Sequence, residues 1–259
     1  MARLPKPSGA LPRKQESKKQ QEQYARVLIV LEDSKNSSCY FERLCTDFGI
    51  NEIEIVPADR KDSTEKHGND PESVIDYAIK RYELDKKKNK DTSFAYVFCV
   101  IDRDGHVGYR DALLRARDVQ KKIPIIVVSS VPCFEYWLLL HFIGHTRPYE
   151  TTEKRSPCDN VIQDLTEAGR IPEYAKGGIT AAIYKRLKSE QSVAIRHAKQ
   201  VVKDHQQLPE SDWNPSTQMH VLVQFLSNIK NQPSKVNCSI YPSGSELISQ
   251  LTLTPPFSA

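Results

Sequence analysis

The sequence predicts an α/β fold in which a parallel sheet is flanked by helices and followed by a mainly helical extension. Over the first half of the chain, short apolar runs alternate with amphipathic segments, which is typical of parallel strands joined by helical crossovers. The run at 96–101, Tyr-Val-Phe-Cys-Val-Ile, is apolar throughout, as expected for a strand buried on both faces. Similar runs at 27–31, 53–56 and 124–129 supply the other predicted strands.

The segments between and after these runs have the spacing and end signals of helices. Apolar residues recur at helical intervals from Tyr40 to Phe48, after serines that suit an N-cap, and Gly49 follows as a stop. Pro71 opens a second helix, where its missing N–H costs nothing. Further helices are predicted over 109–122, 134–142, 159–168, 180–188 and 191–206, with a last one ending near 228.

We therefore divide the chain into four parts. Residues 1–23 carry Lys, Arg, Gln and Pro with almost no apolar side chain, so we expect a flexible basic arm. Residues 24–131 form the α/β domain, and residues 132–230 form a helical extension packed on it. Residues 231–259 are a C-terminal tail rich in Pro and Ser.

Composition indicates a globular protein of the cytoplasm. No run approaches the roughly 20 apolar residues that a transmembrane helix needs, and the N-terminus lacks the apolar core of a signal peptide. The net charge of +4 permits nucleic-acid binding without requiring it. The six cysteines are scattered and show no C-x-x-C pair, so we expect buried thiols rather than disulfides or structural zinc.

Acidic side chains follow two of the predicted strands. Asp102 and Asp104 come directly after the run at 96–101, and Glu32 follows the run at 27–31. Open α/β sheets bind ligands beyond the carboxyl ends of their strands, so these carboxylates are expected to converge there. Converging carboxylates repel one another unless a cation lies between them, and such hard oxygen ligands suit Mg²⁺ or Mn²⁺. The plainer alternative is that Asp-Arg-Asp-Gly forms an ordinary turn after a strand.

Several longer motifs accompany these acids. They are Tyr40-Phe41, the run Ser130-Val131-Pro132-Cys133-Phe134-Glu135-Tyr136-Trp137-Leu138-Leu139-Leu140-His141-Phe142, Tyr174-x-Lys176, and Asn214-Pro215-Ser216-Thr217. Together they resemble the RloB family, also known as AbiLii, over nearly all of residues 26–230. The resemblance implies a Toprim-like fold and a metal-dependent nuclease of bacterial or archaeal phage defence, often encoded beside an AAA- or ABC-type ATPase. It leaves open whether the protein acts alone, as a homo-oligomer or bound to that ATPase.

The first motif departs from the family pattern, which usually runs Glu-Gly-x-x-Thr-Glu. Here Asp33 stands in place of the glycine and Ser37 in place of the second glutamate. If that glutamate helps to hold a second metal, its absence weakens a two-metal mechanism. Asp33 could compensate from one position away, although adjacent residues of an extended chain point to opposite faces. The family's usual Ser-Asn-Pro is also replaced, by Ser-Val-Pro.

The leading hypothesis is metal-dependent hydrolysis of phosphodiester bonds in DNA or RNA. Glu32, Asp102 and Asp104 would bind the metal, and Glu32 or Glu135 would take a proton from the attacking water. The other predicted roles are proton donation to the leaving oxygen by His106, phosphate binding by Lys35 and Arg103, backbone contact by Lys176 and base stacking by Tyr174. Each role has a structural alternative: Lys35 as a solvated loop residue, Arg103 as an ion-pair partner, His106 as a turn hydrogen bond, and Tyr174 and Lys176 as packing.

Two rival functions remain open from the sequence. The first is a non-catalytic subunit that binds nucleic acid or a nucleotide for a defence ATPase, which the serine at position 37 favours. The second is another reaction of Toprim proteins, nucleotidyl transfer or strand passage. Strand passage needs a nucleophilic tyrosine and large companion domains, and the sequence shows no sign of them.

Overall fold

The computed structural model describes residues 25–51, 53–58, 70–90, 93–175 and 178–229. The predicted arm at 1–23, the predicted tail at 231–259 and the candidate Lys176 lie outside these described residues. The strands are β1 (Val27–Leu31), β2 (Ile53–Pro57), β3 (Tyr96–Asp102), β4 (Ile125–Val131) and β5 (Ser216–Thr217). The helices are α1 (Asn36–Phe48), α2 (Pro71–Lys88), α3 (Tyr109–Val119), α4 (Glu135–Leu139), α5 (Pro157–Leu165), α6 (Ala181–Ser189), α7 (Gln191–His205) and α8 (Met219–Ser227), with a 3₁₀ turn, η1, at Glu210–Asp212.

The five strands form one sheet in the order β2-β1-β3-β4-β5. The first four run parallel, and only β5 is antiparallel to its neighbour β4. The α/β class and the mostly parallel sheet predicted from the sequence are therefore confirmed, and the arrangement is consistent with a Toprim-like fold. The short strand β5 was not predicted, because two residues are too few to show an apolar alternation.

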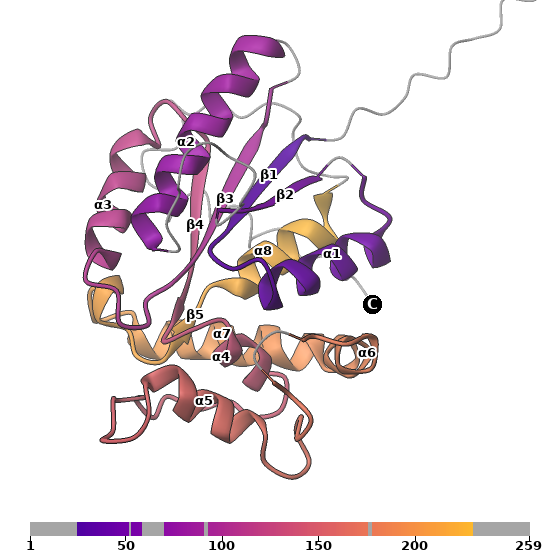
Figure 1. Ribbon diagram of the computed structural model, residues 1–259, viewed down its shortest axis with the longest axis vertical. Coiled ribbons are helices and arrows are strands. Elements are labelled where there is room, and N and C mark those ends of the chain that lie inside the picture. Colours follow the sequence, from indigo (N-terminus) through magenta and orange to yellow (C-terminus); the bar gives the residue numbers. More distant parts are fainter. Residues whose placement is uncertain (1–24, 52, 59–69, 91–92, 176–177, 230–259) are drawn as a thin grey trace, which may run out of the picture.

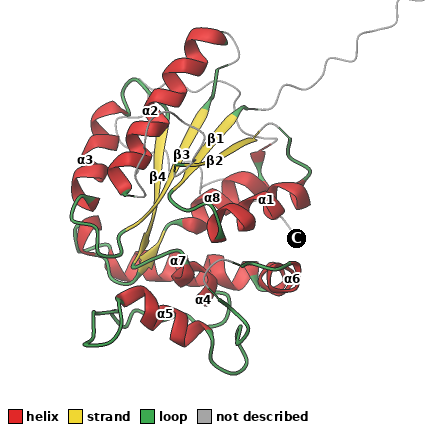
Figure 2. Ribbon diagram, viewed as in Figure 1, coloured by secondary structure: helices red, strands yellow, loops and turns green. Residues whose placement is uncertain are grey.

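Helices cover both faces of the sheet (Figures 1 and 2). Alternate residues of β1, β3 and β4 point to opposite faces and join two separate apolar cores. The helices α2 and α3 pack on one face, whereas α1 and α8 lie on the other, and α4 to α7 gather at one end of the sheet (Figure 1). The core around α1 and α8 continues without a break into α4 to α7, so the helices after Pro132 share a core with the sheet.

Local signals explain several of the helix boundaries. Gly49 adopts the left-handed conformation (φ 63°) that ends α1, as its position predicted. Asp70 caps α2 by accepting a hydrogen bond from the Ser73 N–H at 3.0 Å, with Pro71 in the first turn. The predicted helix over 134–142 is shorter than expected, because only Glu135–Leu139 is helical and the chain then enters turns.

Candidate metal and catalytic site

The strand order places the predicted acids at the topological switch point of the sheet. After β1 the chain crosses to β2 on one side, and β3 pairs with β1 on the other, so the carboxyl ends of β1 and β3 lie side by side. Such a position is where open α/β sheets bind their ligands. Glu32 follows β1 directly and Asp102 is the last residue of β3, so both stand at this edge.

Glu32 and Asp102 are in direct contact. The Glu32 N–H donates to the Val100 carbonyl at 3.2 Å, which continues the ladder between β1 and β3 by one step. In return, the Glu32 carboxylate accepts a hydrogen bond from the Asp102 N–H at 2.9 Å. The Asp102 carboxylate accepts one from the Phe134 N–H at 3.0 Å. Two backbone N–H groups, those of Asp102 and Phe134, therefore bind the two carboxylates.

The two carboxylates repel each other in a poorly solvated setting. Burial raises the pKa of Glu32 to about 7, and the charges of Asp33, Asp104 and Asp70 add to this effect. Burial also raises the pKa of Asp102 well above its usual range, and the charges of Glu32 and Glu135 act in the same direction. A bound cation would favour the charged form of both groups.

Asp104 and His106 lie on the turn that follows β3. Asp104 is exposed, with a positive φ of 32°, and its charge acts on Glu32. The His106 Nε2 atom lies 3.2 Å from the Glu32 carboxylate, so His106 contacts a predicted metal ligand. His106 also acts on Asp70: burial raises the pKa of Asp70, but hydrogen bonds from Ser73 and the nearby His106 lower it by more.

Asp70 was missed as a residue of this region by the sequence reasoning. Its side chain caps α2, and helices in a parallel crossover begin near the edge where the strands end. The sequence signal was the capping pattern Asp-Pro-x-Ser, from which we predicted only the start of a helix at Pro71. Its charge nevertheless acts on Glu32.

The structure shows what Asp33 does in place of the family's glycine. Its carboxylate accepts hydrogen bonds from the N–H groups of Lys35 (2.7 Å), Asn36 (2.6 Å) and Ser37 (3.3 Å), and from the Ser37 hydroxyl (2.5 Å). Asp33 therefore stabilises the turn that starts α1, and Ser37 is one of its donors. Lys35 is exposed on this turn, three residues after Glu32.

Glu135 is buried, with 5% of its surface exposed, and faces the same region from α4. Its carboxylate accepts hydrogen bonds from the Tyr174 hydroxyl at 2.8 Å and the Asn36 side chain at 3.2 Å. Burial and the charge of Glu135 raise the pKa of Tyr174, so its hydroxyl keeps its proton and acts as the donor. Tyr174 is itself buried, which places it as a partner of Glu135 rather than at the surface.

A disulfide lies beside Glu135 and corrects the expectation of free thiols. Cys133 and Cys158 are bonded to each other and tie the end of β4 to α5. The Cys158 sulfur lies 3.5 Å from the Glu135 carboxylate. Among the described residues, one group of three side chains has potential metal-binding atoms that all lie within 4.8 Å of one another: Cys133, Glu135 and Cys158. The three predicted acids, which the structure also describes, do not form such a group. At the sheet edge, the Glu32 carboxylate contacts the Asp102 N–H, and the charge of Asp104 acts on Glu32.

Arg103 occupies the position between Asp102 and Asp104. Its N–H donates to the Ser130 carbonyl at 2.9 Å, and its guanidinium donates to the Ser211 carbonyl in η1 at 3.4 Å. The residue therefore ties the turn after β3 to both β4 and η1. This contact directs the guanidinium toward η1.

The fold and this edge define an α/β protein with a pair of carboxylates at the switch point of a mostly parallel sheet, the place where such sheets bind ligands. Comparison with family models then identifies the family. Residues 27–226 match the model of the RloB-like proteins, so the chain belongs to the RloB-like family. No match was found among curated proteins or among solved structures. None of the described helices combines the length and apolar character that crossing a membrane requires.

Proposed function

We propose that this protein is a metal-dependent nuclease of the Toprim type that hydrolyses phosphodiester bonds in DNA or RNA. The observation that carries the proposal is the contact between Glu32 and Asp102 at the switch point, where both carboxylates have raised pKa values. Carboxylates crowded in this way are costly to a protein unless a cation or a proton offsets their repulsion. The oxygen donors fit Mg²⁺ or Mn²⁺.

Each residue of the site has a role in this proposal. Glu32 and Asp102 hold the metal and Asp104 joins them from the exposed turn; when bound, the metal would stabilise charge on the scissile phosphate and lower the pKa of a water. His106, in contact with Glu32, donates a proton to the leaving oxygen. Lys35 and Arg103 bind phosphate oxygens beside the acids.

Glu135 is the candidate for general base, because its charge acts on Asp102 from a buried position. Tyr174 and Asn36 orient its carboxylate by hydrogen bonds. We assign Tyr174 to this positioning role in preference to base stacking, since its ring is buried. Lys176 stays a proposed contact to the substrate backbone.

The biological setting follows from the family. We propose that the protein acts in prokaryotic phage defence, in the cytoplasm, together with an AAA- or ABC-type ATPase. A second candidate function is a non-catalytic subunit that binds nucleic acid or a nucleotide for such an ATPase. The engagement of Asp33 in the turn before α1 favours it, because that carboxylate is occupied by four donors and does not replace a second metal ligand.

Cleavage assays on matched variants test the proposal. The purified protein, alone and with the proposed AAA- or ABC-type ATPase partner, is incubated with labelled DNA and RNA in Mg²⁺ or Mn²⁺. We expect Asp102→Asn and Glu32→Gln to lower the cleavage rate by at least about 100-fold. Asp118→Asn, which changes an exposed acid on α3 in the same way, should leave the rate unchanged. Cleavage that survives both site substitutions would refute the proposed site.

Calorimetric titration separates the two candidate functions. A nuclease of this kind should bind Mg²⁺ or Mn²⁺ in the millimolar range or tighter, and Asp102→Asn should weaken that binding. Nucleic-acid binding that needs no metal, with no cleavage under any of these conditions, would favour the non-catalytic subunit.

A further inference from the structure

A cavity lies at the opposite end of α2 from the acidic site. It has a volume of about 850 Å³ and is bounded by the last turns of α2, the end of α3 and the turn that leads into β4. Asp70 caps α2 beside the acids, whereas Lys86 is 16 residues further along, a distance of about 24 Å at 1.5 Å per residue. We call this cavity the α2–α3 groove; it is a separate place on the molecule.

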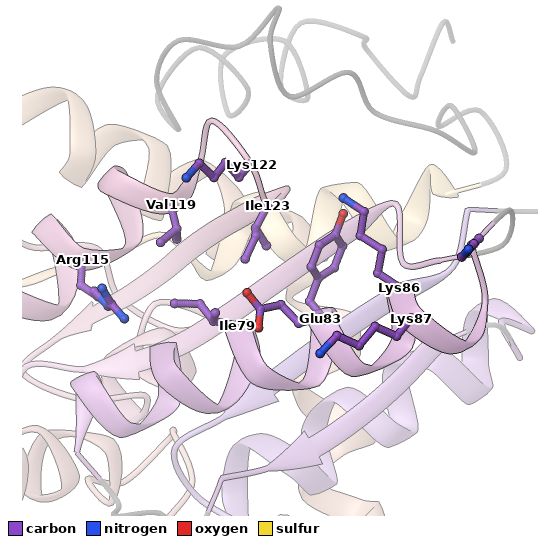
Figure 3. A pocket seen from close by; sticks show the side chains of 10 residues that line it. Ile79, Glu83, Lys86, Lys87, Arg115, Val119, Lys122 and Ile123 are labelled. Carbon is purple, nitrogen blue, oxygen red and sulfur yellow. The ribbon is translucent and has the colours of Figure 1, made fainter.

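The walls of the α2–α3 groove are strongly basic. Five cationic side chains line it against a single carboxylate, that of Glu83. The cations come from both walls: Lys86 and Lys87 from the α2 side, and Arg115 and Lys122 from the α3 side (Figure 3). Lys90, just beyond α2, also lines the groove. Arg115 is paired with Asp76 at 3.3 Å, but both side chains are more than half exposed, so this ion pair is weak. The groove therefore attracts anions.

The floor of the groove is apolar. It is formed by Ile79, Val119 and Ile123, which lie between the cations in Figure 3, together with Tyr82. The Lys86 ammonium lies 5.6 Å from the centre of the Tyr82 ring, which holds its charge above an aromatic face. A bare phosphate would gain nothing from such a floor. A ligand with both a ring and phosphates would use both parts of the groove.

The helix dipole explains only part of the distribution of cations around the groove. Lysines in the last turn of a helix are favoured by its dipole, and Lys86 to Lys88 occupy that turn of α2. Arg115 lies in the body of α3 and Lys122 follows its end, yet both line the same cavity. The dipole also does not account for the apolar floor or for the concave shape. The volume falls in the range of about 300–1,000 Å³ that is usual for small-ligand sites.

From these observations we infer that the α2–α3 groove binds a nucleoside phosphate, with the base against the apolar floor and the phosphates among the lysines. The ligand is either a free nucleotide or the terminal nucleotide of a strand. This site is distinct from the proposed metal site and requires no divalent cation. It goes beyond the proposed function, because a protein without nuclease activity would bind the same ligand.

Titration of ATP into the full-length protein with EDTA present tests the inference, because EDTA removes any contribution of a metal site. We expect the double charge reversal Lys86→Glu with Lys122→Glu to weaken ATP binding by at least about tenfold. The matched control, Lys154→Glu with Lys185→Glu, reverses two exposed lysines elsewhere and should bind ATP as the wild type does. Circular dichroism of both variants verifies that they are folded.

The role of the floor is tested with inorganic tripolyphosphate, which carries the charge of ATP without its base. We expect it to bind at least about tenfold more weakly than ATP. Equal binding of the two probes, or ATP binding that is unchanged in the Lys86→Glu, Lys122→Glu variant, would overturn the inference. A 5′-phosphorylated oligonucleotide that displaces ATP identifies a strand end as the ligand, and failure to displace it identifies a free nucleotide.

The same titration on Asp102→Asn separates this inference from the nuclease proposal. ATP binding should persist in that variant even though metal-dependent cleavage is lost. Loss of ATP binding in Asp102→Asn would place the nucleotide at the acidic edge and refute the groove as its site.

Discussion

Replacing Glu32 with glutamine should stabilise the metal-free protein at pH 8. Glutamine fills nearly the same space without a charge and can still accept the hydrogen bond from the Asp102 N–H. The pKa of Glu32 is raised by burial from 4.5 to about 7, a difference of about 2.5, which corresponds to roughly 3 kcal/mol. Since the contact with His106 is weakened, we expect a net gain of about 1–3 kcal/mol in the free energy of unfolding.

The pH dependence fixes the sign of this effect. Because the folded pKa of Glu32 lies above the unfolded one, the folded state binds more protons between pH 4.5 and about 7. The stability associated with protonated Glu32 is therefore fully present below 4.5 and is lost as the pH rises through about 7. The advantage of Glu32→Gln should be smallest near pH 4.5 and largest at pH 8.

Urea unfolding followed by circular dichroism measures this difference. Wild type, Glu32→Gln and the control Asp118→Asn are compared at pH 4.5, 6 and 8 in EDTA, and then at pH 8 with Mg²⁺. Magnesium should stabilise the wild type and have less effect on Glu32→Gln, since binding to the folded state shifts the equilibrium. A difference between wild type and Glu32→Gln that stays constant with pH would refute the buried, crowded carboxylate on which the proposed metal site depends.

Three further predictions concern the supports of the fold and site. Asp85→Ala should lower the free energy of unfolding by roughly 3 kcal/mol, because the Asp85 carboxylate is only 2% exposed and pairs with Arg26 at 3.1 Å. Chemical denaturation measures this change, and a loss below about 1 kcal/mol would contradict the prediction. Tyr174→Phe should lower the free energy of unfolding by about 1–3 kcal/mol, because it removes a hydrogen-bond donor to the buried Glu135 carboxylate. If Glu135 acts as the base, this substitution should also slow cleavage. An unchanged unfolding curve would argue against the hydrogen bond. Cys158→Ser should lower the free energy of unfolding in oxidising buffer by about 3 kcal/mol, because the disulfide links two residues that are 25 positions apart. In reducing buffer the substitution should make little difference. Thermal unfolding with and without a reductant measures both effects.

The strands and the close pair of acids could be predicted from the sequence because both follow from local pattern and topology. Strands buried on both faces must be apolar throughout, so β1, β3 and β4 stand out as runs. Parallel strands end at one edge, so Glu32 and Asp102 had to approach each other if β1 and β3 were neighbours. Neither step requires knowledge of side-chain packing.

Contacts between distant segments could not be predicted in this way. Tyr174 and Glu135 are 39 residues apart, and their hydrogen bond depends on how the segment that contains Tyr174 packs against α4. The pairing of Cys133 with Cys158 likewise depends on α5 folding back onto the end of β4, since cysteine connectivity does not follow from spacing alone. Asp70 directly precedes the predicted helix start at Pro71, but its approach to the acids depends on where α2 begins in space.

The continuous core beneath the sheet bears on how the protein can be shortened. Tyr96 and Phe98 of β3 pack against Phe225 of α8, with ring centres 4.7 and 4.8 Å apart. A fragment ending at residue 131 would keep α1 on this face but would lose α8 and expose these rings, and exposed apolar patches favour aggregation. The sheet therefore cannot be isolated by cutting after β4, and a shortened protein must keep the chain at least through α8.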